Sequence, residues 1–135
     1  MTKVSFYLFE KSPERQVHST CRLCRKILKK AEKIWLYCPD TALQQELDEL
    51  LWSFDPQSFL AHGIDDVQAP ICISSNLPDQ PEWIVFNFHQ EALADAQRFG
   101  HIIEIIENNE AAKQIGRQKY KSYRQSSLAP QTYKL

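Results

Sequence analysis

Glycine is scarce in this sequence of 135 residues, which contains only Gly63, Gly100 and Gly116. Loops that bind nucleotide phosphates place glycine where a strand turns into a helix, because a side chain would keep the backbone amides away from the phosphate. None of the three belongs to a GxGxxG motif, or to a GxxxxGK motif followed by Ser or Thr. The sequence therefore argues against a nucleotide-binding protein.

Long hydrophobic runs and catalytic motifs are also missing. No apolar run approaches the roughly 20 residues of a membrane-spanning helix, and the opening MTKVSFYLFE reaches a charge too early for a secretory signal. We expect a cytoplasmic protein without membrane contact, whose cysteines are reduced thiols. The sequence contains neither G-x-S-x-G nor H-E-x-x-H. No catalytic residue and no cofactor is predicted, so the protein is expected not to be an enzyme.

The C-x-x-C pair Cys21 and Cys24 follows His18, which gives the pattern H-x-x-C-x-x-C. Redox-active pairs lie at a helix N-terminus, where the dipole lowers the thiol pKa, whereas this pair is expected about two turns inside a helix. A structural zinc site needs four ligands, usually from two segments, and the sequence has no second pair of this kind. Small buried thiols are therefore favoured over a thiol or zinc protein, and no metal ligand is assigned.

Hydrophobic periodicity predicts strands and helices that largely alternate along the chain. The predicted strands are residues 4–9, 34–38, 71–74, 83–88 and 101–106. The predicted helices are residues 14–31, 41–52 with Asp40 as N-cap, 91–97 and 109–125. The last ten residues are expected to be a loose or docked tail. This order predicts one α/β domain over residues 1–135, with parallel strand pairs covered by helices on both faces.

Acidic residues stop at Glu110, although the whole chain is nearly balanced, with 17 acidic and 16 basic side chains. Beyond Glu110 the sequence carries six basic residues, namely Lys113, Arg117, Lys119, Lys121, Arg124 and Lys134. A basic end on a nearly neutral chain predicts one localised anionic partner.

Helical spacing gathers part of this charge on one side of the last predicted helix. At 100° per residue, an arc of about 80–100° holds Lys113, Arg117, Tyr120, Lys121 and Arg124. Ile115 and Tyr123 point to the other side, where the core is expected. A charge run is usually a solvated face, but an aromatic ring between cations suits a peptide with a carboxylate and an apolar side chain. It suits single-stranded nucleic acid equally well, because the ring can stack a base.

The irregular segment 53–81 is rich in Asp and Pro and is the expected place for a functional loop. Trp52, Phe54 and Phe59 lie in a stretch that Asp55-Pro56 interrupts, so they do not all belong to one regular element. Such side chains are either anchors for a protein interface or a small cluster that covers the sheet edge. The residues by themselves do not separate these alternatives.

Four segments together resemble the χ subunit family of bacterial DNA polymerase III. They occur in the family's order over nearly the whole chain and read FYLFE (6–10), CRLCRK (21–26), LDELLWSFDPQSFLAH (47–62) and RQKYKSYR (117–124). The third segment is the most specific. The resemblance implies a three-layer α/β/α sandwich around a mostly parallel, Rossmann-like sheet without a nucleotide-binding motif.

The resemblance also implies a non-catalytic clamp-loader accessory subunit that acts in DNA replication. Such a subunit would bridge the ψ (psi) subunit to the acidic C-terminal tail of single-stranded DNA-binding protein, which ends in a Pro-Phe carboxylate. By position, the tail-binding face would consist of Arg117, Tyr120, Lys121 and Arg124. The ψ contacts would be Trp52 and Phe59. The resemblance favours a peptide partner and no direct DNA contact; the alternative is direct binding of single-stranded DNA by the basic last helix.

Overall fold

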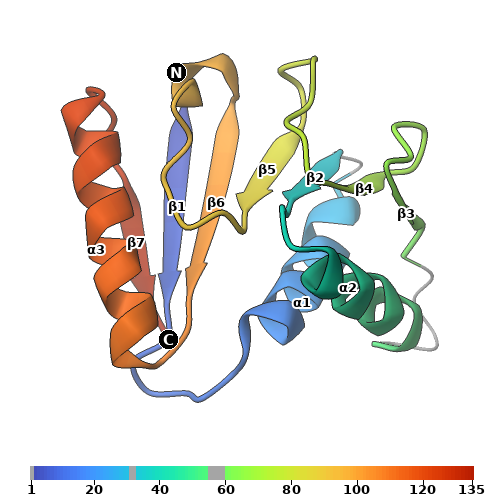
Figure 1. The fold of residues 1–135 in the computed structure, drawn as a ribbon, viewed down its shortest axis with the longest axis horizontal. Coiled ribbons are helices and arrows are strands. Elements are labelled where there is room, and N and C mark those ends of the chain that lie inside the picture. The colour runs from blue at the N-terminus through green and yellow to red at the C-terminus, as the bar shows by residue number, and fades with distance from the viewer. Residues whose placement is uncertain (1, 31–32, 55–59) are drawn as a thin grey trace.

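The computed structural model describes residues 2–30, 33–54 and 60–135 (Figure 1). Within them the helices are α1 (Gln16–Leu28), α2 (Thr41–Ser53) and α3 (Glu110–Gln125), with one short 3₁₀ turn at Ala96–Arg98. The strands are β1 (Lys3–Leu8), β2 (Ile34–Tyr37), β3 (His62–Ile64), β4 (Ile71–Ser74), β5 (Ile84–Asn87), β6 (His101–Ile106) and β7 (Gln131–Lys134). No helix in the described ranges is long and apolar enough to cross a membrane.

The described strands form one sheet in which every pair is parallel, in the order β3-β4-β2-β5-β6-β1-β7. Successive side chains point to opposite faces of a sheet, so each face carries its own apolar cluster. One cluster packs against α1 and α2. The other packs against α3 and the segment that joins β5 to β6. The predicted three-layer α/β/α sandwich with a parallel sheet is thereby confirmed.

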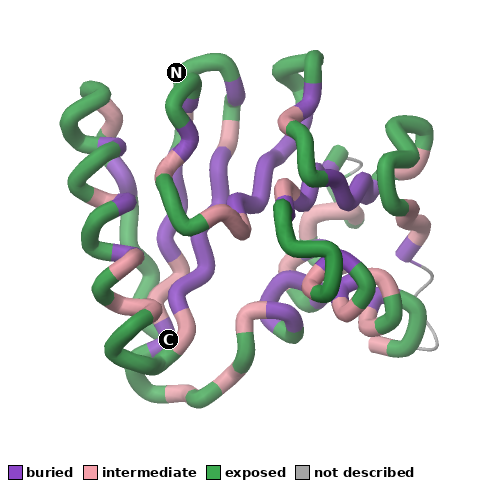
Figure 2. Tube along the Cα trace, viewed as in Figure 1, coloured by how far each residue is buried: buried purple, intermediate pink, exposed green. Residues whose placement is uncertain are grey.

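Two of the helices begin at capping side chains. The Asp40 carboxylate accepts a hydrogen bond from the Ala42 amide at 3.0 Å, which confirms the predicted N-cap of α2. Asn109 caps α3 in the same way through the Ala112 amide. Leu47 and Leu51, four residues apart, bury one side of α2 in the core. Figure 2 shows the same one-sided burial along α3.

The helix predicted over residues 91–97 is wrong. Asn87 Nδ2 donates to the Glu91 carbonyl at 2.9 Å, and the Leu93 amide donates to the Tyr123 hydroxyl at 3.2 Å. These partners satisfy backbone groups that a helix would pair internally. Leu93 is also buried against the sheet. The chain therefore runs from β5 to β6 as an irregular segment with a single 3₁₀ turn.

The two edge strands, β3 and β7, have no counterpart among the predicted elements. β3 has only three residues, and all four residues of β7 are exposed, so neither shows a hydrophobic pattern. β7 pairs in parallel with β1, from Ser5 opposite Gln131 to Leu8 opposite Lys134. Of the two expectations for the tail, loose or docked, the docked one is confirmed. The tail extends the sheet beneath α3.

Candidate functional site

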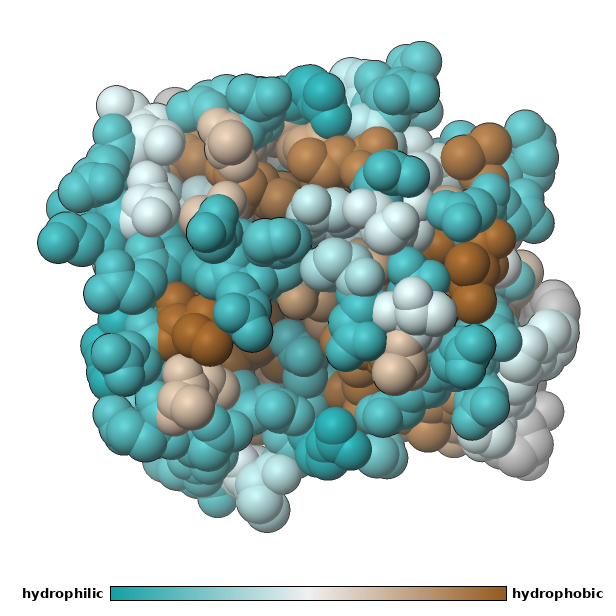
Figure 3. Space-filling view, viewed as in Figure 1, coloured by the Kyte–Doolittle hydropathy of each residue, from teal (hydrophilic) through white to brown (hydrophobic). Residues whose placement is uncertain are grey.

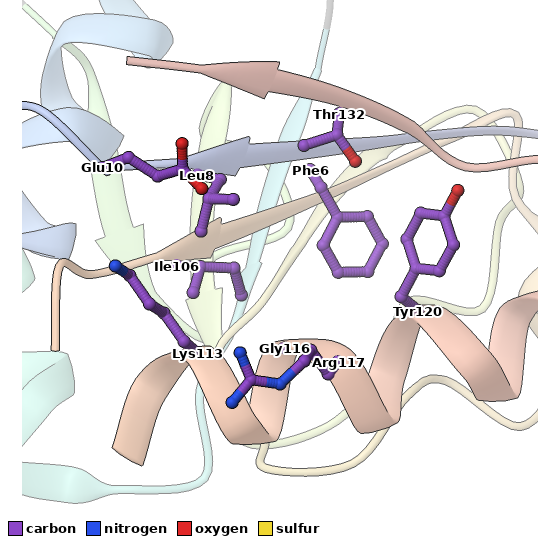
Figure 4. Close-up of a pocket in the computed structure, with 9 residues that line it drawn as sticks. All are labelled: Phe6, Leu8, Glu10, Ile106, Lys113, Gly116, Arg117, Tyr120 and Thr132. Carbon is purple, nitrogen blue, oxygen red and sulfur yellow. The ribbon is translucent and has the colours of Figure 1, made fainter. Parts of the chain in front are cut away.

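A pocket opens between α3 and the β1–β7 edge of the sheet (Figure 4). Its volume is about 180 Å³, and its lining consists of Phe6, Leu8, Glu10, Ile106, Lys113, Gly116, Arg117, Tyr120 and Thr132. The apolar floor comes from alternate residues of β1, because these point to the α3 face. The Tyr120 ring stands edge-on to Phe6, with the centroids 5.5 Å apart and the planes at 64°. The pocket therefore has an aromatic wall and an apolar floor.

Gly116 lets α3 approach the sheet closely at this pocket. A Cβ atom at this position would lie 2.8 Å from Ile106 Cδ1 and 3.1 Å from Cγ1. A side chain here would therefore push α3 away from β6 or move Ile106 into the pocket. Since glycine inside a helix costs about 1 kcal/mol relative to alanine, the close approach has a stability cost.

Two cations border the apolar floor. Lys113 and Arg117 both come from α3, and Figure 4 shows Lys113 and Glu10 on opposite sides of one end of the pocket. Arg117 Nη2 donates to Glu110 Oε1 at 2.8 Å, but the two side chains are 64% and 82% exposed. An exposed pair of this kind is worth at most about 1 kcal/mol, so a ligand carboxylate can displace Glu110 from Arg117. The pocket suits a ligand with an apolar group beside a negative charge.

The predicted tail-binding residues are only partly gathered in this pocket. Arg117 and Tyr120 line it, whereas Lys121 and Arg124 are exposed on α3 and do not. Lys113 belongs to the predicted basic face but not to the predicted site, and it does line the pocket. The β1 and β7 residues of the lining escape sequence reasoning, because only the pairing of these strands brings them to α3.

A polar cluster is also buried between α3 and the sheet. The Glu104 carboxylate accepts hydrogen bonds from Lys119 Nζ at 2.8 Å, the Tyr123 hydroxyl at 2.6 Å and Asn87 Nδ2 at 2.8 Å. Burial raises the pKa of Glu104, and the charge of Lys119 and these hydrogen bonds act in the opposite direction. Lys119 is thus the one basic residue of the C-terminal segment that faces the interior. Tyr123 confirms the predicted core side of the helix, whereas Ile115 is only half-buried.

Exposed apolar side chains lie toward the far edge of the sheet. Trp52 at the end of α2 and Ile64 on β3 are 60% and 42% exposed, and Val67, which follows β3, is 53% exposed and borders a separate groove beside Trp35 and Trp83. The brown surface at the right of Figure 3 lies over β3 and the turn that follows it. The Trp52 ring stands edge-on to His62 at 4.9 Å. Phe59, the other predicted ψ contact, lies outside the described residues.

His62 packs against Trp52 from the interior. Its side chain is fully buried, and Nδ1 lies 2.6 Å from the Leu60 carbonyl oxygen. Nε2 lies 3.1 Å from the Asp48 carboxylate. These hydrogen-bond partners orient the imidazole ring against which Trp52 packs. His62 is a satisfied polar residue and is paired with Asp48.

The cysteines are packing residues in this structure. Cys21, Cys24, Cys38 and Cys72 are all free and buried, which confirms the predicted buried thiols. Burial raises the pKa of the Cys21 thiol to about 12 and also raises the pKa of Cys24. A thiol held in its neutral form is a poor nucleophile and a poor metal ligand. In the described parts of the chain, no three His, Cys, Asp or Glu residues are placed to hold a metal ion.

Comparison with known proteins identifies the family of this chain. The model of the family described as "DNA polymerase III chi subunit, HolC" matches residues 1–131. A protein of Pseudomonas aeruginosa named DNA polymerase III subunit chi is 29% identical over 139 aligned residues, which cover 100% of this chain and 98% of that protein. A protein of the same name from Haemophilus influenzae is 30% identical over 112 residues, which cover 77% of this chain and 76% of that protein.

Proposed function

This chain belongs to the family of DNA polymerase III chi subunits, which gives it an accessory role in DNA replication, and from that membership we propose a non-catalytic adaptor. The adaptor bridges the ψ subunit of the clamp loader to the acidic C-terminal tail of single-stranded DNA-binding protein. The two partners bind at opposite edges of the sheet. The tail binds beside β7 and ψ binds beside β3.

The pocket under α3 is the observation that carries the tail proposal. A cavity of about 150 Å³ accepts a benzene ring, so the pocket of about 180 Å³ has room for a terminal Phe side chain. The ring would lie on Phe6 and Leu8 and against Tyr120. Lys113 and Arg117 stand at the rim, where a C-terminal carboxylate next to that ring would lie. The pocket would then recognise the terminal Phe twice, by burying its ring and by pairing its carboxylate with the two cations.

Lys121 and Arg124 have a different part in this proposal. Both are exposed on α3, and no carboxylate within the described ranges pairs with them. They are placed to attract the acidic residues that precede the terminal Phe. Exposed charges of this kind raise the association rate and contribute about 0–1 kcal/mol each. Their contribution is expected to fall with salt.

The ψ proposal rests on the exposed side chain of Trp52. Aromatic residues that stand exposed beside smaller apolar side chains are the usual anchors of protein interfaces. Trp52 is more than half exposed, and one edge contact with His62 already packs its ring against the protein. Phe59 follows α2 by a few residues and is proposed as the second anchor.

Calorimetric titration with acidic peptides tests the tail site. One peptide ends in Asp-Ile-Pro-Phe, and its control lacks the Phe. We expect binding only to the first, and about tenfold weaker binding for Lys113→Ala and for Arg117→Ala, since a charge-assisted hydrogen bond is worth about 1.5–3 kcal/mol. Lys30→Ala removes one exposed charge just beyond the end of α1 and should bind like the parent. Equal binding of both peptides would exclude this pocket.

Co-elution with ψ tests the other edge independently. Trp52→Ala should abolish co-elution and leave peptide binding unchanged. Lys113→Ala should weaken peptide binding and leave co-elution unchanged. If Trp52→Ala weakens both interactions together, the variant is misfolded or the two sites are not separate. Circular dichroism of the variant distinguishes these cases.

A further inference from the structure

A second basic segment lies at the start of the chain, far from α3 in the sequence. Residues 15–30 contain no acidic residue and six basic ones, namely Arg15, Arg22, Arg25, Lys26, Lys29 and Lys30. The charge of this segment is hidden in the overall balance, because the acidic residues lie elsewhere. Three of these cations, Arg22, Arg25 and Lys26, belong to α1, and Lys29 and Lys30 follow its end. This helix lies on the face of the sheet opposite α3.

The α1 cations border a groove. It lies between α1, β1 and the end of the chain, has a volume of about 450 Å³, and is lined by Tyr7, Phe9, Ser19, Arg22, Leu23, Arg25, Lys26, Lys29 and Leu135. Because β1 side chains alternate, Tyr7 and Phe9 face this groove while Phe6 and Leu8 face the tail pocket. The groove and the tail pocket are therefore separated by the sheet.

The cations follow the helix axis. Arg22, Lys26 and Lys29 stand at positions i, i+4 and i+7, which places them on one side of α1 over about 10 Å. Lys26 and Lys29 are exposed, and no carboxylate of the described residues pairs with either. Arg22 is held by Glu14 at 2.7 Å. The result is a row of charge with two uncompensated ammonium groups.

An aromatic stack adjoins this row of charge. Tyr7 of β1 and Tyr133 of β7 are stacked, with ring centroids 5.3 Å apart and planes 22° from parallel. Tyr7 lines the groove. Since β7 is the edge strand, the second face of the Tyr133 ring points away from the sheet, and this residue is 39% exposed. The stack offers a flat apolar surface to a planar ligand group.

We propose that this groove binds single-stranded DNA. Lys26 and Lys29, with Arg22, contact successive phosphates, and a base stacks on Tyr133. Proteins that bind single strands combine a cationic track with an aromatic platform in this way. A base inside a duplex is already stacked on both faces, so the platform selects the single strand. The inference is independent of the tail site and departs from the sequence-based expectation of no direct DNA contact.

An acidic peptide fits this groove less well than a nucleic acid. In the tail pocket the cations converge on one small apolar cavity, as a carboxylate next to an apolar side chain requires. On α1 they are spread along the helix, and the adjoining surface is a ring face at the sheet edge. The regularly spaced phosphates and the planar bases of a nucleic acid match that arrangement.

Fluorescence anisotropy of the full chain with a labelled oligothymidine of about 15 nucleotides tests the proposal across a salt series. Lys26→Ala with Lys29→Ala should weaken binding at least tenfold and reduce the salt slope by about 1.4, the value for two phosphate contacts on a single strand. Tyr133→Leu should weaken binding of the oligothymidine and leave an abasic oligonucleotide unaffected. The pair of results separates phosphate contact from base stacking.

Lys121→Ala with Arg124→Ala is the matched control, because it removes the same charge from α3. It should leave oligonucleotide binding within about twofold of the parent. If it weakens binding as much as the α1 double variant, DNA binds at α3 and the proposal is overturned. The absence of binding at low salt overturns it too. The proposal is also overturned if an acidic peptide displaces the oligonucleotide fully and Tyr133→Leu has no effect, because the groove would then be a peptide site. Tail-peptide titration of the same variants reports separately on the pocket under α3.

Discussion

Lys119 Nζ lies 2.8 Å from Glu104 Oε1, and both side chains are buried between α3 and the sheet. The carboxylate also accepts hydrogen bonds from Tyr123 and Asn87. Since Tyr123 in turn accepts from the Leu93 amide, the cluster joins α3, β6 and the segment between β5 and β6. This connection sets the position from which Tyr120, one residue after Lys119, reaches the tail pocket.

Removing one partner of this pair should destabilise the protein strongly. Lys119→Met leaves the Glu104 carboxylate without its cation in a buried site, and breaking such a pair costs about 3–5 kcal/mol. Urea unfolding of the variant measures this loss. Glu104→Leu combined with Lys119→Met should cost clearly less than the sum of the single variants, because no uncompensated charge remains. Additive losses would mean that the two residues do not act as a pair.

Gly116→Ala should damage peptide binding more than it damages the fold. The new methyl group would lie 2.8 Å from Ile106 Cδ1, so Ile106 is driven toward the pocket floor or α3 moves outward. Alanine is better than glycine in a helix by about 1 kcal/mol, which offsets part of the strain. We expect a small change in the urea midpoint and a clear loss of affinity in calorimetry. Adding Ile106→Val frees space and should restore part of the affinity. An unchanged affinity would mean that the ligand does not enter this end of the pocket.

His101 should make the protein less stable as the pH falls. Burial, followed by the charge of Lys3, lowers the pKa of His101 to about 4 from its usual 6.5. The unfolded chain therefore binds a proton that the folded chain refuses, and stability from this group is lost between about pH 6.5 and pH 4. The ring is in hydrogen-bond contact with Ser5 Oγ at 3.0 Å. Urea unfolding of parent and His101→Gln over this range should show a smaller acid loss in the variant. Parallel curves would show that His101 does not contribute.

Asp40→Ala should lower the stability of the protein measurably, because it removes the N-cap of α2. The substitution removes the acceptor for the Ala42 amide, and losing an N-cap of this kind costs about 1 kcal/mol. Asp40→Asn keeps an acceptor oxygen and should cost only a few tenths of a kcal/mol. Because Trp52 lies in the last turn of α2, the variant also shows whether the proposed ψ contact at Trp52 depends on the far end of the helix. Equal losses for the two variants would assign the effect to charge and not to capping.

Sequence patterns predicted most of the elements that make the core. The strands at 34–38, 71–74 and 101–106 are apolar runs that are buried on both faces, and such runs are visible without knowledge of their neighbours. The capped helices after Asp40 and Asn109 are equally local. The helix prediction for residues 91–97 was wrong because the backbone of this segment bonds to Asn87 and Tyr123, which belong to other elements. Local propensity carries no information about such partners.

By itself the sequence determined the α/β order of elements, the basic side of the last helix and the resemblance that the family match bears out. Only the tertiary structure decided which cations stay on the surface and which residues share a pocket. Lys119 and Lys121 are two residues apart, yet one is buried on Glu104 and the other is exposed. The pocket needs β7, whose four exposed residues have no pattern of their own and become a strand because β1 offers an unpaired edge. Spacing along a helix fixes which residues share a side, whereas the partner that each side meets depends on contacts between segments distant in the chain.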